Sequence, residues 1–239
     1  MKILALETSA KSVSVAVVEN GAVLASAYQN MGLTHSVTLM PLLDSMLKNA
    51  GLTARDMSLI AVAAGPGSFT GLRIGVSAAK GLAWALELPC CGVSTLEAMA
   101  ENARAFEGTV ICAMDARRQQ IYNAVFGCRD GVLERRCADR AVALEILADE
   151  LKNDNNRKIV VGDGAKLCYI YLLEHGLPCS MAPAADLYQN AAGVGLAAER
   201  MAAEGRTVTA QALCPVYLRL SQAERERLAK GLPITLENQ

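Results

Sequence analysis

The sequence predicts an α/β protein of two lobes that repeat one order of elements: three strands, a helix, a strand and a helix (βββαβα). Two observations support this fold class. Each half of the chain opens with a short apolar run that ends in an acidic residue, Glu7 in the first half and Asp115 in the second. In each half, alternating apolar residues, an Asn-Gly or Asp-Gly turn and another strand follow, which is the pattern of a β-hairpin.

The first half is expected to contain strands over residues 2–8, 13–17 and 22–29, a helix over 35–50, a strand over 59–64, and helices over 71–87 and 95–106. Asn20-Gly21 is the two-residue turn between the second and third strands. Gly51 ends the first helix and Pro89 follows the second, because neither residue continues a helix well. Gly92-Val93 leads into the third helix.

The second half is expected to contain strands over 110–114, 121–126 and 132–136, a helix over 142–152, a strand over 158–161, and helices over 165–175 and 186–204. Superposing Glu7 on Asp115 places Val13 on Ile121, so the halves match in pattern although their identity is low. This duplication is the organisation of the actin, sugar-kinase and Hsp70 ATPase group, which binds a nucleotide between its lobes. We therefore divide the chain into an N-terminal lobe (1–106), a C-terminal lobe (107–220) and a tail (221–239) that docks on the first lobe or extends from it.

Composition excludes several classes of function. The net charge of −1 gives no support for a protein that grips nucleic acid alone, which usually shows a basic face. The eight cysteines form no Cys-x-x-Cys pair, no signal-peptide pattern opens the chain, and no apolar run reaches ~18 residues. We therefore expect a cytoplasmic protein with reduced cysteines and no membrane contact. The two histidines, His35 and His175, lack ligand spacing, so we expect no metal site.

The most informative stretch is a glycine-rich segment between the strand over 59–64 and the helix over 71–87. Its residues are Gly65, Pro66, Gly67, Ser68, Phe69, Thr70 and Gly71. Such a segment can turn sharply and present N–H groups at a helix N-terminus, where anions bind. Three known motifs do not fit, however. Thr70 stands where a Walker A loop or a dinucleotide fingerprint needs glycine, and Pro66 and Thr70 stand where a nucleophile elbow needs glycines.

As a whole, this segment closely resembles the signature of the bacterial TsaB family, also called YeaZ. Supporting matches occur in family order along nearly the whole chain: Ile3-Leu4-Ala5-Leu6-Glu7-Thr8-Ser9, Leu88-Pro89, Gly92-Val93-Ser94-Thr95, Met114-Asp115-Ala116-Arg117 and Pro215-Val216-Tyr217-Leu218-Arg219. The glycine segment combined with the late Pro-Val-Tyr-Leu-Arg is far more specific than a lone glycine motif.

The resemblance implies a two-lobed, actin-like (Gcp-like) fold and a part in making threonylcarbamoyladenosine. This modification falls on the adenosine beside the anticodon of tRNAs that read codons beginning with A. The resemblance further implies a non-catalytic scaffold that binds and positions the catalytic paralogue TsaD, recruits the ATPase TsaE, and meets tRNA only through the complex. TsaC would supply threonylcarbamoyl adenylate. The chain would form a homodimer when TsaD is absent, and ATP or ADP would bind only in the complex.

A comparison with the catalytic paralogue supports the absence of catalytic residues. TsaD carries a His-x-x-x-His metal pair, and alignment through Pro89 and Val93 places Thr95 and Met99 at those positions here. Neither side chain is a competent ligand for a hard or borderline divalent ion. A catalytic or metal role for this chain is therefore not expected.

Two readings are open for the acidic residues at the first-strand ends. In one, Glu7, Thr8, Ser9 and Asp115 face a nucleotide or its metal. In the other, Glu7 caps the Thr8-Ser9 turn and Asp115 caps a turn near the Arg117-Arg118 backbone.

Two helices have features of a partner surface. In the helix over 35–50, apolar residues that include Leu39, Leu42, Leu43 and Met46 span roughly 160°, wider than the roughly 100° stripe of a helix on one core. A helix wedged between a sheet and a neighbouring helix would show the same width.

In the helix over 71–87, small residues recur every fourth position, and Gly75 and Gly81 each cost about 1 kcal/mol relative to Ala unless tight packing offsets it. Trp84, the only tryptophan, shares a face with polar residues, and this favours an interface anchor or partial burial under a loop. Together with the residues of the helix over 35–50, the partner interface is expected to contain four residues of this helix: Arg73, Ser77, Lys80 and Trp84.

Two other functions remain as alternatives. An independent ATPase or kinase of the same fold would need a phosphate-binding lysine or a catalytic aspartate, and no such motif is evident. A peptidase would need a zinc motif, a nucleophile elbow or a Cys-His pair, which the spacing does not provide.

Overall fold

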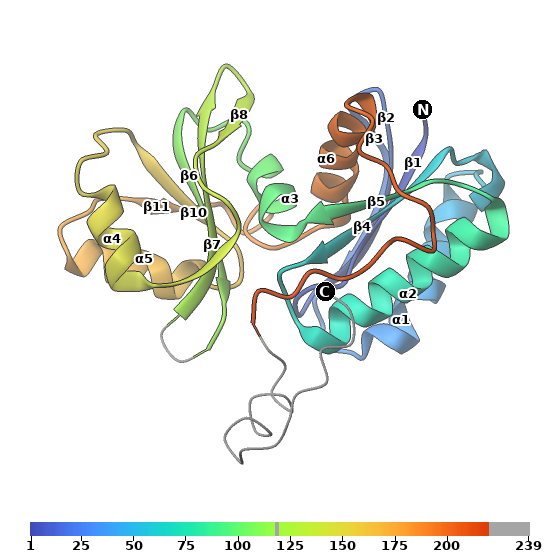
Figure 1. Cartoon of the computed structure of the whole chain (residues 1–239), viewed down its shortest axis with the longest axis horizontal. Helices are drawn as coiled ribbons and strands as arrows, with labels where there is room; N and C mark the ends of the chain where they lie inside the picture. Colours follow the sequence, from blue (N-terminus) through green and yellow to red (C-terminus); the bar gives the residue numbers. More distant parts are fainter. Residues whose placement is uncertain (118–119, 220–239) are drawn as a thin grey trace, which may run out of the picture.

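Two mixed β-sheets stand side by side in the computed structural model, which describes residues 1–117 and 120–219 (Figure 1). The first sheet contains β1 (Ile3–Glu7), β2 (Val13–Glu19), β3 (Ala22–Gln29), β4 (Leu59–Gly65) and β5 (Cys90–Ser94), in the spatial order β3-β2-β1-β4-β5. The second contains β6 (Gly108–Asp115), β7 (Gln120–Arg129), β8 (Val132–Arg135), β10 (Lys158–Val161) and β11 (Ser180–Met181), in the order β11-β10-β6-β7-β8. A sixth strand, β9 (Arg140–Ala143), pairs with β7 outside this order. The two orders correspond strand for strand. The duplicated, actin-like α/β fold class expected from the sequence is therefore confirmed.

Helices form three further layers around and between the sheets. On the outer face of the first sheet lie α1 (His35–Asn49) and α2 (Phe69–Leu86), and α4 (Leu144–Leu151) and α5 (Ala165–Glu174) lie on the outer face of the second (Figure 1). Between the sheets lie α3 (Thr95–Glu101) and α6 (Ala191–Ala203), which pack against each other. A short 3-10 helix, Ala54–Asp56, precedes β4.

The central strand β1 is buried on both faces, which explains its continuous apolar sequence. Side chains alternate across a strand, so Leu4 and Leu6 join the core beneath α1 and α2, whereas Ile3 and Ala5 join the core beneath α6. Glu7, at the end of the same strand, is thereby held at the boundary between the halves.

Three strands and two helix boundaries differ from the expectation. The residues treated as a linker into the third helix form β5, which pairs in parallel with β4, and the short strands β9 (Arg140–Ala143) and β11 carry no clear periodic signal. The third helix ends at Glu101 instead of residue 106. The helix expected from residue 186 begins at Ala191, because the Asn190 side chain accepts a hydrogen bond from Gly193 N (3.0 Å) and caps it.

The internal match between the halves is shifted by one residue relative to the expected superposition. Glu7 pairs with Ser14 across the β1–β2 hairpin, whereas Asp115 pairs with Ile121 across the β6–β7 hairpin. Ser14, and not Val13, is therefore the counterpart of Ile121, because the first hairpin connection is one residue longer.

The position of α6 bears on the expected division of the chain. Although α6 follows the second sheet in sequence, it packs across β1, β2, β4 and β5 of the first sheet. The division into lobes at residue 107 stays a prediction, and the expected docking of the tail over 221–239 lies outside the described residues. Within the described ranges, no helix combines the length and apolar character that a membrane crossing requires.

Candidate functional site

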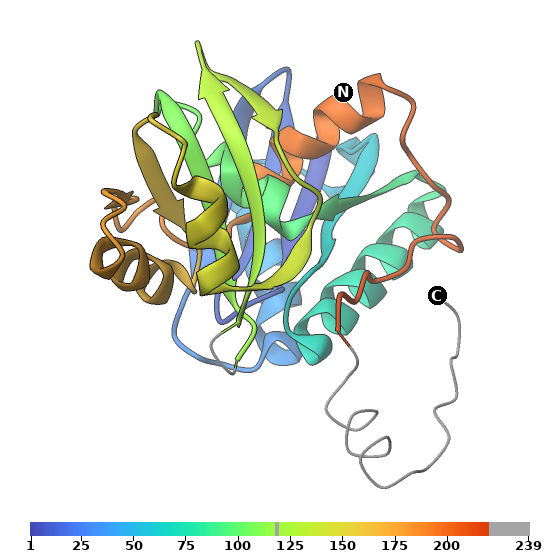
Figure 2. The same cartoon turned by 60° about the vertical axis from the view of Figure 1, so that its left-hand side comes forward.

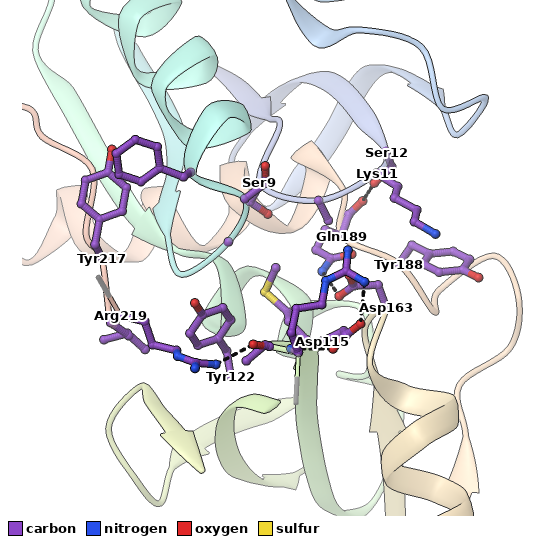
Figure 3. Close-up of a pocket in the computed structure, with 18 of the residues that line it drawn as sticks. Ser9, Lys11, Ser12, Asp115, Tyr122, Asp163, Tyr188, Gln189, Tyr217 and Arg219 are labelled. Atoms are coloured by element: carbon purple, nitrogen blue, oxygen red, sulfur yellow. Dashed lines mark hydrogen bonds and ion pairs between the residues drawn. The ribbon is translucent and has the colours of Figure 1, made fainter. Parts of the chain in front are cut away.

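A cleft of about 750 Å³ lies between the two halves, where β1 and β6 end (Figure 3). Its walls come from the β1–β2 turn, the end of β6, the β10–α5 turn, the residues before α6 and the last described residues. The polar and charged lining includes Ser9, Lys11, Ser12, Asp115, Arg117, Tyr122, Asp163, Tyr188, Gln189, Tyr217 and Arg219. Because both basic and acidic side chains line it, the cleft has a mixed electrostatic character.

The glycine-rich segment packs directly on the turn after β1. A Cβ atom on Gly67 would lie 2.5 Å from Ser9 O, and one on Gly71 would lie 2.1 Å from Thr8 O. The backbone N–H of Ser68 donates to Ser9 O (2.6 Å), and Thr8 Oγ1 donates to Gly71 O (2.8 Å). Close backbone approach therefore accounts for these two glycines, and it ties the start of α2 to the floor of the cleft.

The ends of the same segment are also constrained by packing. Gly65 has a φ of +137°, and a Cβ atom there would lie 2.1 Å from Val216 O, so a side chain is excluded on both counts. The Gly65–Pro66 peptide bond is cis. Ser68 caps α2 through its side chain, and Phe69 and Thr70 form the first turn of the helix.

Glu7 is a carboxylic acid with no exposure to solvent. Its Oε1 accepts a hydrogen bond from Ser9 N (2.5 Å), while its Oε2 has no partner among the described residues. Burial raises the pKa of Glu7 to about 7, hydrogen bonds from Ser9 oppose the rise, and the nearby charge of Asp163 adds to it. Glu7 therefore holds the Thr8-Ser9 turn, as the capping alternative expects. Its contact with a nucleotide stays a prediction.

Asp115 holds the equivalent turn in the second half, because its Oδ1 accepts from Arg117 N (2.7 Å). Asp163, which follows β10, accepts a hydrogen bond from Gln189 Nε2 (2.9 Å), and burial raises the pKa of Asp163. Neither Asp163 nor Gln189 was expected in the site. The Gly162-Asp163-Gly164 turn was a usable signal for Asp163. It follows β10 in the second half, just as the glycine-rich segment follows the corresponding strand β4 in the first half.

The residue types that bind metals are dispersed in the described part of the chain. Among residues 1–117 and 120–219, no three His, Cys, Asp or Glu side chains lie close enough together to bind one. His35 Nε2 lies 2.7 Å from Ala10 O, and His175 Nδ1 lies 2.8 Å from Tyr171 O, so the described hydrogen bonds of both rings are to backbone carbonyls. Thr95 and Met99 are buried, as the start and core-facing side of α3 require.

The last described residues, 213–219, form a strap that runs from the first sheet to the second. Val216 N donates to Ala64 O (2.7 Å), and Arg219 Nη1 donates to Ala116 O (2.6 Å). Figure 3 shows Tyr217 and Arg219 along one wall of the cleft. The strap therefore connects the two halves at the cleft mouth.

The structure corrects the expected partner surface on α1. Leu39, Leu43 and Met46 are buried in the core between α1, α2 and the first sheet, and Leu42 is half-buried against it. The wide apolar arc thus reflects a helix wedged between a sheet and a neighbouring helix. The first three residues offer no surface to a partner in the isolated chain.

The exposed apolar side chains near α1 lie elsewhere. Met31 and Leu33 precede the helix, and Val37 and Met40 lie on its outer side; the exposed fractions are 79% for Met31 and 70% for Val37. We call these four residues the apolar patch. It adjoins a groove of about 610 Å³ between α1 and α2, of which Met40 is itself a lining residue.

The residues expected on α2 keep their surface positions. Arg73 and Ser77 are exposed and line the α1–α2 groove, whereas Lys80 Nζ donates to the carbonyls of Gln211 (3.1 Å) and Leu213 (3.0 Å). Trp84 is 72% exposed, so no described loop buries it.

Comparison with known proteins assigns the family. A family model described as TsaD, tRNA N6-adenosine threonylcarbamoyltransferase, matches residues 29–226. The Bacillus subtilis (strain 168) protein named tRNA threonylcarbamoyladenosine biosynthesis protein TsaB is 34% identical over 233 residues, which cover 94% of this chain and 96% of the relative. The chain belongs to the TsaB (YeaZ) family.

Further members of the TsaB family agree in sequence and in structure. The Escherichia coli (strain K12) TsaB protein is 34% identical over 228 residues, covering 92% of this chain and 95% of that protein. The solved structure of YeaZ from Pseudomonas aeruginosa superposes with a TM-score of 0.78 at 29% identity, covering 91% of this chain and 99% of that one. The TsaB likeness thus extends over both sheets and the helices between them.

A second Pseudomonas aeruginosa structure, with a TM-score of 0.79 at 28% identity, carries a description of similarity to peptidase YEAZ; it covers 91% of this chain and 99% of its own. In the present TsaB-family chain, the described contacts of His35 and His175 are to backbone carbonyls and an aromatic ring, not to a serine or cysteine. The described residues therefore show no activated nucleophile of the kind a serine or cysteine peptidase uses.

Proposed function

We propose that this chain is a non-catalytic subunit required for threonylcarbamoyl transfer to tRNA adenosine, and that it binds and positions a TsaD-type catalytic paralogue. The relatives in the TsaB family carry the name tRNA threonylcarbamoyladenosine biosynthesis protein. The observation that carries the scaffold role is the exposure of the apolar patch, of which Met40 also lines the α1–α2 groove, because large exposed apolar surfaces mark protein-binding sites.

The proposal places the partner on the outer side of α1 and along the exposed row of α2. Val37 and Met40 supply apolar contact, and Arg73 and Ser77 supply polar contact at the groove. Trp84, near the end of α2, is a second anchor. In the absence of the paralogue, the same surface joins two copies of this chain.

The proposed complex has two further components. TsaE, the ATPase, is recruited once this chain and TsaD are paired, and tRNA is reached through the assembled complex. The net charge of −1 supports an indirect contact with tRNA, because a chain that neutralises many phosphates needs an excess of basic residues.

Reconstitution tests the proposal. Threonylcarbamoylation of tRNA by TsaC, TsaD and TsaE is measured with this chain present, absent, or replaced by Val37→Asp or Trp84→Ala. We expect product only with the chain, and a loss of TsaD affinity of about 10- to 100-fold for Val37→Asp, because a charge would be desolvated at the interface. Trp84→Ala is expected to weaken TsaD binding without changing the free energy of unfolding.

The matched control is Val132→Asp, which changes an equally apolar and exposed residue on β8 of the second sheet. It is expected to leave TsaD binding and product formation unchanged. Equal product with and without the chain, or equal losses for Val37→Asp and Val132→Asp, would overturn the proposal.

A second candidate, an independent ATPase or kinase, is favoured by one observation. The cleft between the halves is lined by three basic residues, Lys11, Arg117 and Arg219. The sequence shows no motif for a phosphate-binding lysine or a catalytic aspartate, and this counts against it. Magnesium-dependent ATP turnover by the isolated chain would favour this second candidate. Turnover no greater than that of a boiled control would favour the scaffold role.

A further inference from the structure

The groove between α1 and α2 is an open and partly apolar surface. The strap runs along α2 in both Figure 1 and Figure 2, where it is the red end of the coloured chain. Its floor and sides include Leu39, Met40, Ile74 and Ala78, and its near end is formed by Phe69. Phe69 also lines the cleft between the halves, so it separates the groove from the cleft. From Phe69 to Ala78 the groove follows ten residues of α2, whose nine steps of 1.5 Å span about 14 Å.

The strap brings the chain to the near end of this groove. The ring of Tyr217 stacks on the ring of Phe69 with 4.6 Å between centroids, and Tyr217 OH accepts a hydrogen bond from Arg73 Nε (3.1 Å). The guanidinium of Arg73 also lies 4.0 Å from the centroid of the Phe69 ring. Two residues that line the groove therefore hold Tyr217, and only two described residues follow Tyr217.

The chain continues for 20 residues beyond Arg219, and its sequence matches an apolar groove. Leu232, Ile234 and Leu236 alternate with Pro233 and Thr235, so in an extended conformation all three point to one side. Pro233 favours such a conformation for the residue before it. The five residues would extend over about 13 Å at roughly 3.3 Å per residue, which matches the length of the groove. The twelve residues between Arg219 and Leu232 are more than enough to reach it.

We propose that residues 232–236 of this chain dock in the α1–α2 groove of the free protein and compete there with the partner. The docking concerns the free chain alone, while the competition rests on the proposed function, in which the same groove adjoins the partner. Because the segment is tethered at Tyr217, its effective concentration at the groove is high, so individually weak apolar contacts suffice. A partner of higher affinity displaces the segment by occupying the groove.

Thiol reactivity in the free chain tests the docking. In a Cys214→Ser background, which removes the exposed native cysteine, Met40→Cys places a thiol in the groove and Ala85→Cys places one on α2 outside it. Each variant is made in the full chain and in a chain ending at Arg219, and the rate of modification by a maleimide is measured. We expect Met40→Cys to react about fivefold more slowly in the full chain, as a docked population of about four-fifths requires. Ala85→Cys is expected to react equally in both.

Two substitutions in the segment distinguish docking from a general effect of chain length. Ile234→Asp in the full chain should raise the reactivity of Met40→Cys to that of the shortened chain, whereas Thr235→Asp, on the opposite side, should not. Equal reactivity of Met40→Cys in the full and shortened chains overturns the proposal. Slow reaction of Met40→Cys that is the same in the full and shortened chains and is lost on dilution also overturns the proposal, because a second copy of the chain would then cover the groove.

The competition is measured separately as the affinity for TsaD. If both proposals hold, the shortened chain binds TsaD more tightly than the full chain, by about the same fivefold factor. If TsaD binds neither form, the proposed function fails, while the thiol measurement still decides whether the segment docks.

Discussion

At the scale of single residues, Glu7 combines complete burial with an incomplete set of hydrogen bonds. One carboxylate oxygen accepts from the backbone of Ser9, and the other has no partner among the described residues. An ionised carboxylate in this position carries a desolvation cost that the neutral acid avoids. Burial therefore raises the pKa of Glu7 to about 7, and the negative charge of Asp163 contributes to the rise.

The raised pKa of Glu7 predicts a loss of stability with rising pH. Between the ordinary pKa of 4.5 and about 7, the folded protein binds a proton at Glu7 that the unfolded chain has released. Stability from this group is thus complete below pH 4.5 and lost as pH rises to about 7, by an amount on the order of 3 kcal/mol. Glu7→Gln should remove this part of the pH dependence, measured by urea unfolding from pH 5 to pH 8.

The control for Glu7 is Glu174→Gln, which changes an exposed carboxylate at the end of α5. It should leave the slope of stability against pH as in the unsubstituted chain. A slope that is the same in Glu7→Gln and in the unsubstituted chain would contradict a raised pKa at Glu7.

At the scale of elements, the two glycines inside α2, Gly75 and Gly81, have different surroundings and therefore different effects on stability. Gly75 faces the β1 end, and a Cβ atom there would lie 2.3 Å from Thr8 Oγ1 and 3.3 Å from Val62 Cγ2. Gly81 faces solvent, and beyond its chain neighbours and the backbone of its own helix no atom lies within 4 Å of an added Cβ. Tight packing therefore offsets the helix cost of glycine at position 75, and nothing in the described structure offsets it at position 81.

This difference predicts opposite effects of the same substitution on one helix. Gly75→Ala should lower the free energy of unfolding by about 1–3 kcal/mol, because the methyl group overpacks the contact with Thr8. Gly81→Ala should raise it by about 0.5–1 kcal/mol, because it removes the conformational cost of glycine in a helix. Denaturant unfolding of both variants checks the signs, and a gain for Gly75→Ala would contradict the packing explanation.

Sequence reasoning found the periodic elements and the overall duplication, because these depend on local patterns of apolar residues. It missed β5, β9 and β11, whose pairing is decided by neighbouring strands rather than by their own residues. It singled out Glu7 and Asp115, which occupy equivalent places as the last residues of β1 and β6. Gln189 and Arg219 could not be placed in the cleft, because only the folded path of the last third of the chain brings them there.

The partner residues of α1 illustrate the same limit. Periodicity showed a wide apolar face but not which part of it meets the sheet, so it selected Leu39, Leu43 and Met46, which the core buries. The exposed side chains are Val37 and Met40 on the outer side of the same helix. A wide apolar face that is buried against two neighbours and one that is partly exposed to solvent produce the same periodicity in the sequence.

At the scale of the whole molecule, a network of charged side chains joins the two halves through α3. Glu97 accepts from Arg135 Nη2 on β8 (3.0 Å) and from Arg200 Nη2 on α6 (3.3 Å). Arg200 also pairs with Glu101, whose side chain is fully buried. Because β8 belongs to the second sheet and α6 packs on the first, Glu97 connects both.

The network predicts that Glu97→Ala loosens the junction between the halves. We expect a loss of about 1–2 kcal/mol in the free energy of unfolding, because two arginines lose a partly buried partner. Glu204→Ala, which removes an exposed ion pair with Arg206, should change it by less than about 0.5 kcal/mol. Urea unfolding followed by circular dichroism compares them, and equal effects would contradict a joining role for Glu97.

The packing of α6 on the first sheet also has a consequence for synthesis on the ribosome. The side chains of Val194, Ala197 and Ala198 complete the core around Ile3 and Ala5, and Gly195 lies so close that a Cβ atom would be 2.4 Å from Val18 Cγ2. The strands made first thus keep one apolar face uncovered until nearly 200 residues have emerged. The second sheet, whose strands and outer helices are contiguous from Gly108 to Met181, can close earlier. The half that is translated first is therefore the half that finishes folding last.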